Sequence, residues 1–164
     1  MALGDITLYK SGANTGSLGS IRHQVAAGGS PPAINAGELV SKTLGNQYVI
    51  TNPSSGQAVA TNFLAGVSTS TSTETASLDG FVDVAPIDAG TIWLIAPAVA
   101  ATWNTQAKYN ALVGARVLIQ KVNGVYTILA ADGSTNGCIV ENLNIFTYPG
   151  LVAFSLRQAL AYYA

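Results

Sequence analysis

From Ile34 onward, apolar residues come in runs of only a few positions, and most runs are ended by glycine, proline, asparagine or aspartate. Runs this short suit β-strands, because a helix needs a longer stretch with a period of 3.6. The pattern is typical of an all-β barrel or sandwich with little helix. It predicts strands at residues 39–42, 47–51, 63–68, 80–84, 91–95, 115–120, 125–130, 137–142 and 151–156.

Turn signals separate the later strands. Asn123-Gly124 is typical of a two-residue hairpin, and Asp132-Gly133 also predicts a turn. Two segments are ambiguous: residues 105–112 suit a short helix or a loop, and residues 151–163 are long enough for an amphipathic helix. For the second we expect a strand, because the Pro149-Gly150 turn restarts the chain after a β-rich segment.

Residues 1–33 predict an extended arm. Ile6, Leu8, Ile21 and Val25 alternate with polar neighbours, which suits a strand added to another sheet or laid over a partner. We therefore divide the chain into an arm, residues 1–33, and a β-barrel domain, residues 34–164, and expect the barrel to fold without residues 1–30. Breakers of regular structure recur in the arm at Gly4, Gly12, Gly16, Gly19, Gly28, Gly29, Pro31 and Pro32.

Charged residues make up only 9% of the chain, against roughly 25% in an average soluble domain, while 49% are apolar. A surface so poor in charge must depend on Ser, Thr, Asn and Gln for solubility, or be covered in an assembly. We favour the second alternative, a surface that is partly covered by other subunits in an assembly.

The same composition argues against nucleic acid and membrane as partners. The seven basic residues are scattered singly, so no group of them can neutralise several phosphates together. The longest apolar stretch, Ile92–Ala101, contains Pro97 and is too short for a membrane span. The start of the chain lacks a basic segment followed by an apolar one, so we expect synthesis in the cytoplasm rather than secretion.

The chain has few residues of the types that form catalytic or metal-binding sites. Cys138 lies in an apolar run, which favours a buried small side chain, and one cysteine cannot form a disulfide framework or a thiolate metal site. His23 lies in the arm without an acidic neighbour. Asp79, Asp83 and Asp88 suit turn positions better than a calcium site or carboxylate pair. We therefore predict no catalytic residue, cofactor or metal.

The remaining candidates concern surfaces. Residues 68–77, rich in Ser and Thr, predict a polar loop or solvated edge, with a glycan or receptor contact as the alternative. Trp93 lies in an apolar run and is expected in the core, whereas Trp103 and the terminal tyrosines suit an interface. The predicted protein-interface residues are Leu3, Ile6, Leu8, Tyr9, Ile21, Arg22, Val25, Trp103, Tyr162 and Tyr163.

Residues 34–158 resemble the small decoration, or cement, proteins of tailed-phage capsids. In that family a Gly-Val strand is followed by a Gly-x-Val-x-Val strand and a Gly-x-Ile/Val-Trp strand. The residues that carry the resemblance are Ile34-Asn-Ala-Gly-Glu-Leu-Val40, Phe63-Leu-Ala-Gly-Val67, Asp79-Gly-Phe-Val-Asp-Val-Ala-Pro86 and Ala89-Gly-Thr-Ile-Trp-Leu94, with Val113-Gly-Ala-Arg-Val-Leu118 and Gly137-Cys-Ile-Val140 similar to the closing strands.

The resemblance implies a compact, tulip-like or SH3-like β-barrel, often a homotrimer, seated on the outer capsid surface where several major capsid subunits meet. Its partners would be the major capsid protein and further copies of itself, and its location the virion after synthesis in the host cytoplasm. A protein that binds only the assembled lattice stabilises it by mass action, without any reaction.

Two other classes of function stay in view. One is another phage structural role, as a tail, collar or head-fibre component. The other is an enzyme or a free-standing binding module, which the scarcity of charge and of catalytic residue types disfavours.

Overall fold

The computed structural model describes residues 6–10, 19–28, 31–43, 48–51, 62–87, 90–130 and 138–156. Each strand expected between residues 39 and 156 is present, with ends shifted by at most two residues. The elements are β1 (Thr7–Lys10), β2 (Ile21–Val25), β3 (Leu39–Thr43), β4 (Val49–Thr51), β5 (Asn62–Ser68), β6 (Gly80–Pro86), β7 (Ile92–Ile95), a 3-10 turn (Ala100–Thr102), α1 (Gln106–Asn110), β8 (Arg116–Val122), β9 (Val125–Leu129), β10 (Cys138–Val140) and β11 (Val152–Leu156).

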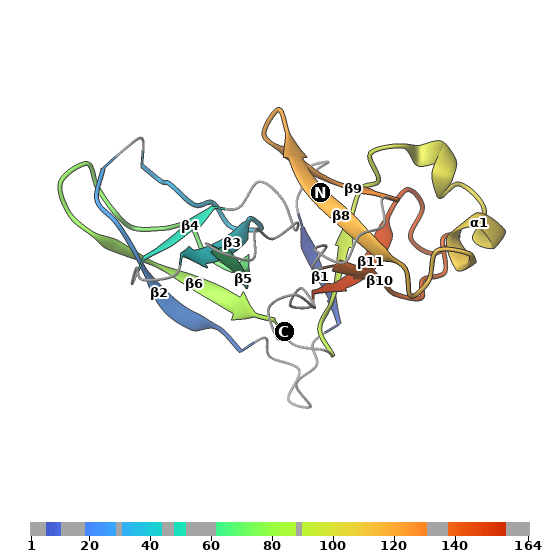
Figure 1. The fold of residues 1–164 in the computed structure, drawn as a ribbon, viewed down its shortest axis with the longest axis horizontal. Coiled ribbons are helices and arrows are strands. Elements are labelled where there is room, and N and C mark those ends of the chain that lie inside the picture. Colours follow the sequence, from blue (N-terminus) through green and yellow to red (C-terminus); the bar gives the residue numbers. More distant parts are fainter. Residues whose placement is uncertain are drawn as a thin grey trace.

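The strands form two antiparallel sheets that lie in two lobes (Figure 1). One sheet has the order β1-β7-β11-β10-β8-β9 and the other β2-β6-β5-β3-β4. The first curls until the segment after β7 meets β9, where Ile128 exchanges backbone hydrogen bonds with Ala96 and Ala98. The second curls until β2 meets β4 at the bridge between Gln24 and Tyr48. The predicted all-β class, a small barrel or sandwich, is therefore confirmed.

Side chains of the five-stranded sheet enter two apolar clusters, because alternate residues of a strand point to opposite faces. Leu39 belongs to a large cluster shared with the six-stranded sheet, and its neighbour Val40 belongs to a smaller one. The smaller cluster comprises Val25, Ile34, Val40, Val49, Val82 and Val84. The large cluster therefore packs the two sheets against each other, while the smaller cluster lies within the five-stranded lobe alone.

A β-bulge brings Leu64 and Val67 to the same face of β5. Val40 pairs with Gly66 and Ser41 with Leu64, so Ala65 is the extra residue of the bulge. Gly66 has a φ of 153°, and a Cβ there would lie 1.8 Å from the carbonyl oxygen of Ala85. Only glycine permits this close approach of β5 to β6.

Two segments of the expected arm, β1 and β2, belong to the two sheets of this chain. β1 pairs with β7 and β2 pairs with β6, both antiparallel. Ile6 and Val25 lie in the core, 5% and 3% exposed. The alternating pattern did indicate strands, but it does not tell which sheet a strand joins. Deletion of residues 1–30 would therefore remove core side chains, and the expectation that it leaves the fold intact is not supported.

The other local predictions have clear outcomes. Part of the ambiguous segment 105–112 is helical as α1, whose first turn is capped by Thr105, and β11 confirms a strand as far as Leu156. Trp93 and Cys138 are buried as expected, and burial raises the pKa of the Cys138 thiol well above its usual value. None of the described helices is long and apolar enough to span a membrane.

The Ser/Thr-rich segment is a loop that completes the hydrogen bonding of β6. The Asp83 N–H donates to Ser70 Oγ at 3.0 Å, and the Phe81 N–H donates to Thr73 Oγ1 at 3.0 Å. Ser72 Oγ accepts from the Ile34 N–H at 3.0 Å and contacts the Ile34 carbonyl at 3.1 Å. Side-chain hydroxyls thus replace the missing main-chain partners of an irregular strand, which explains the residue types of this run.

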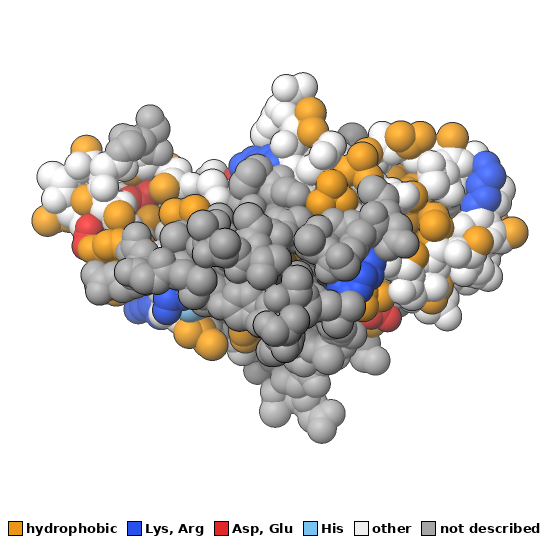
Figure 2. Space-filling model, in the orientation of Figure 1, with side chains coloured by type: hydrophobic (Ala, Val, Ile, Leu, Met, Phe, Trp, Pro, Cys, Tyr) orange, Lys and Arg blue, Asp and Glu red, His pale blue; other side chains and the backbone are white. Residues whose placement is uncertain are grey.

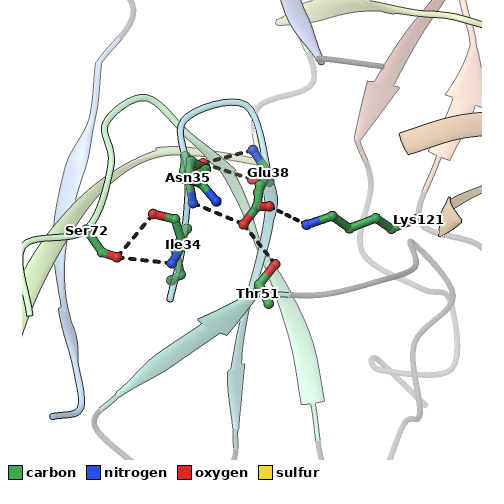
Figure 3. A network of polar contacts seen from close by, with 7 residues as sticks. Ile34, Asn35, Glu38, Thr51, Ser72 and Lys121 are labelled. Atoms are coloured by element: carbon green, nitrogen blue, oxygen red, sulfur yellow. Dashed lines mark hydrogen bonds and ion pairs between the residues drawn. The ribbon is translucent and has the colours of Figure 1, made fainter. Parts of the chain in front are cut away.

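A polar clamp joins the two lobes (Figure 3). Glu38, 8% exposed, accepts hydrogen bonds from the Asn35 N–H at 3.0 Å and the Thr51 hydroxyl at 3.2 Å, and it forms an ion pair with Lys121 of β8. The Lys121 ammonium also lies 5.3 Å from the centre of the Tyr126 ring, a cation–π contact. Desolvation raises the pKa of Glu38, but the hydrogen bonds and the charge of Lys121 outweigh it, so the pKa is lowered.

Gly66→Ala is expected to lower the free energy of unfolding by about 3 kcal/mol, because the new Cβ would collide with the Ala85 carbonyl. The matched control is Gly114→Ala, where φ is also positive but a new Cβ would meet nothing within 4 Å, so the cost should be about 1 kcal/mol. Urea unfolding measures both. Equal losses in the two variants would contradict the close approach.

Glu38→Gln is expected to lower the free energy of unfolding by about 2 kcal/mol at pH 7, because it leaves the Lys121 ammonium without its counter-charge. Since the pKa of Glu38 is lower in the folded chain, the contribution of the carboxylate is complete above the unfolded-state pKa of about 4.3 and is lost as the pH falls through the folded-state pKa.

The difference between wild type and Glu38→Gln should therefore shrink from pH 7 towards pH 3 in urea unfolding. Asp83→Asn is the control, because it breaks an exposed ion pair with Arg22 and should change the stability at pH 7 much less than Glu38→Gln does. A difference between wild type and Glu38→Gln that stays constant over this pH range would show that the clamp does not depend on the charge of Glu38.

Candidate protein-binding surface

The predicted interface residues fall into three groups. Leu3, Tyr162 and Tyr163 lie outside the described residues, and Leu8 and Tyr9 belong to β1, of which the backbone alone is described. Ile6, Val25 and Trp103 are buried in the apolar clusters of this chain. Ile21, 52% exposed, and Arg22, in an exposed ion pair with Asp83, do lie on the surface.

The most exposed large apolar side chain among the described residues is Phe146, at 81%. It lies in the loop between β10 and β11, and this loop is fixed to α1 through one glutamine. Gln106 donates from Nε2 to the Leu143 carbonyl at 3.0 Å, and its Oε1 accepts from the Ile145 N–H at 3.1 Å. The Phe146 N–H donates to Asn144 Oδ1 at 2.9 Å. The exposed ring is therefore carried by a loop of defined conformation.

Beside Phe146 lies a pocket of about 370 Å³. Trp103 lines it and also lines a neighbouring pocket of about 170 Å³ that includes Val99. We call these two linings together the Phe146 surface. Its residues, none of them charged, are Pro97, Ala98, Val99, Ala100, Thr102, Trp103, Asn104, Ile128, Leu129, Ala130, Ile145, Phe146, Pro149, Gly150 and Leu151.

Trp103 supports this surface from within the core. It is 5% exposed and packs edge-on against Tyr109 of α1, with ring centres 5.7 Å apart. The Tyr109 hydroxyl accepts from the Ala153 N–H and donates to the Glu141 carbonyl, both at 2.9 Å. Burial raises the pKa of Tyr109 to about 12, so the hydroxyl keeps its proton. Buried, hydrogen-bonded aromatic groups thus hold the surface in one shape.

Figure 2 shows hydrophobic side chains gathered over the lobe that contains α1, with Lys or Arg only at its margins in this view. An uncharged surface with an exposed aromatic ring can bind another apolar protein surface. The sequence carries a signal for this surface that the interface prediction did not use. Phe146 stands among Asn144, Thr147 and Pro149, which are turn residues, and a large apolar side chain in a turn is poorly placed for burial.

The residues that were candidates for a catalytic or metal site, Asp79 and His23 among them, interact with other groups of the fold. Asp79 accepts from the Ala27 N–H at 2.8 Å and the Tyr48 hydroxyl at 2.7 Å, and the hydroxyl, then the N–H, lowers its pKa. Desolvation and, secondarily, the charge of Lys42 lower the pKa of His23. Within the described ranges, no group of three or more His, Cys, Asp or Glu is placed to hold a metal ion. Asp88 lies outside the described residues.

Comparisons of the chain with protein-family models, with curated proteins and with solved structures gave no match.

Trp103→Ala is expected to lower the free energy of unfolding by about 3 kcal/mol, since it removes a buried aromatic side chain. Phe146→Ser should change it by less than about 0.5 kcal/mol, because the ring is largely in solvent. Urea unfolding followed by far-ultraviolet circular dichroism compares the two variants. A small effect of Trp103→Ala would contradict its burial in the core.

Proposed function

We propose that the chain is a non-enzymatic structural protein of a virion, a decoration protein that binds the outer surface of an assembled phage head and stabilises it. The partners would be the major capsid protein and further copies of the chain in a homotrimer. The observation that carries the proposal is the Phe146 surface: an uncharged, mainly apolar area beside the exposed ring of Phe146, on a rigid support.

Burial of this surface against a neighbouring subunit would supply the binding free energy. A fully buried Phe side chain contributes roughly 2–3 kcal/mol, and the adjoining apolar residues add to it. The surface carries no charge to be desolvated, which favours an equally uncharged partner surface. Three linked copies would multiply a weak single contact through avidity.

The edge of the six-stranded sheet offers a second kind of contact. β1 stands at the end of the strand order and pairs with β7. A strand from a neighbouring subunit added at this edge would form directional main-chain hydrogen bonds that need no charged side chains.

Phe146→Ser is expected to weaken binding to heads at least about tenfold, because an exposed aromatic anchor contributes about 1.4 kcal/mol or more. The measurement is co-sedimentation of the full chain with heads assembled from the major capsid protein of the same virus. Phe81→Ser is the matched control, since Phe81 is 45% exposed on the other lobe, and it should bind heads like the wild type. Equal binding by wild type and Phe146→Ser would contradict the proposal.

Two further results bear on the class of function. Light scattering coupled to size exclusion gives the oligomeric state, and a trimer is expected. Binding to isolated tails or collars, without binding to heads, would instead favour the other phage structural roles.

A further inference from the structure

The five-stranded lobe has a surface pocket of about 200 Å³ that the proposed function does not use. It is lined by Arg22, Ser70, Thr71, Thr73, Phe81 and Asp83. These residues come from β2, from β6 and from the Ser/Thr-rich loop beside β6. Three segments distant in sequence therefore meet at this pocket.

One wall is a charged pair with fixed geometry. Arg22 and Asp83 are directly opposite in the β2–β6 ladder, and the guanidinium donates from Nε at 3.0 Å and from Nη2 at 3.3 Å to the two carboxylate oxygens. Such a two-point contact orients both groups. The hydrogen bond from Arg22 lowers the pKa of Asp83, so both partners are charged at neutral pH and their charges cancel.

The second wall is an aromatic face. Phe81 precedes Asp83 by two positions on β6, so the two side chains lie on the same face of the sheet. The ring is 45% exposed although the strand that carries it is otherwise well buried at Val82 and Val84. An exposed phenylalanine beside an ion pair is thus held on a rigid strand.

The rim is made of hydroxyl groups whose backbone is held in place. Ser70 and Thr73 each accept a hydrogen bond from the backbone of β6, and the Thr69 N–H donates to the Asp83 carbonyl at 2.8 Å. Thr71, between them, is exposed. The loop therefore presents its hydroxyls at defined positions without first having to be ordered.

From this geometry we propose that the pocket binds one unit of a neutral saccharide. A sugar ring has an apolar face of C–H groups that packs on an aromatic ring, whose face carries partial negative charge. Its neighbouring hydroxyls can both donate to the Asp83 carboxylate and accept from Arg22 or from the loop hydroxyls. The pocket is smaller than those that enclose a drug-sized ligand, about 300–1,000 Å³, and fits a single terminal or branching sugar.

An inorganic anion is the less suitable ligand. The Arg22 guanidinium already faces Asp83, whose negative charge would repel a phosphate or sulfate at the same place. A neutral polyhydroxyl ligand meets no such repulsion. The inference does not rest on the proposed decoration function, because the pocket and the Phe146 surface belong to different sheets.

The test is saturation-transfer NMR on the full chain with methyl glycosides of glucose, galactose, mannose and N-acetylglucosamine as probes. We expect transfer to at least one glycoside, with a dissociation constant on the order of 1 mM. Phe81→Ala should weaken it at least about tenfold, whereas Phe81→Tyr should retain it. The matched control Phe146→Ala removes an exposed phenylalanine of the other lobe and should leave the signal unchanged.

Phe81→Ala should match the wild type in circular dichroism and in the midpoint of urea unfolding, because the ring is half in solvent. If this variant is destabilised, Phe81→Tyr and Arg22→Gln are compared instead. Sugar binding should then be lost in Arg22→Gln and kept in Phe81→Tyr. Three results would overturn the proposal: no transfer to any of the four glycosides, transfer that survives Phe81→Ala, or displacement of the sugar by millimolar inorganic phosphate. Co-sedimentation of Phe81→Ser with heads reports separately on the decoration function.

Discussion

The large apolar cluster shared by the two sheets is the contact on which the rest of the structure depends. The strands are short, three to seven residues each, and a sheet of such strands gains stability when its apolar face is packed against another element. Leu39, Leu64 and Val67 turn one face of the five-stranded sheet towards the six-stranded sheet, and the bulge at Gly66 brings the last two to that face. The shared cluster therefore joins the two curled sheets into one packed body.

Several charged groups among the described residues hold the lobes together or bind irregular backbone. Glu38 pairs with Lys121 between the lobes, Glu74 accepts from the Ala33 N–H, and Lys108 donates to the Ala101 carbonyl near the end of the 3-10 turn. Hydroxyls of the Ser/Thr-rich loop complete the bonding of β6 in the same way. Polar groups that stabilise irregular backbone are not available to solvate the surface, and this leaves uncharged areas such as the one around Phe146.

The sequence was a good guide to local structure because the period-two pattern and the turn residues act locally. It predicted the strands from β3 to β11, the burial of Trp93 and the burial of Cys138. It could not assign β1 and β2 to a sheet, since alternation in Ile21–Val25 is the same whether a strand joins its own chain or a partner. It gave no sign that Trp103 is buried, because the polar residues that follow it, Asn104 and Thr105, precede α1 and are unrelated to the packing of the tryptophan. Pairing and burial of this kind depend on residues far away in the sequence.

The two candidate surfaces lie on different lobes of the molecule. The Phe146 surface adjoins α1 in one lobe, whereas the pocket of Arg22, Phe81 and Asp83 lies on β2 and β6 in the other (Figure 1). A chain that docks through its α1 lobe would leave the β2–β6 face uncovered. The clamp of Glu38 and Lys121 and the shared cluster hold the lobes in a fixed relation, so the orientation of one surface sets that of the other. Docking through the Phe146 surface therefore uses none of the residues that line the proposed sugar pocket.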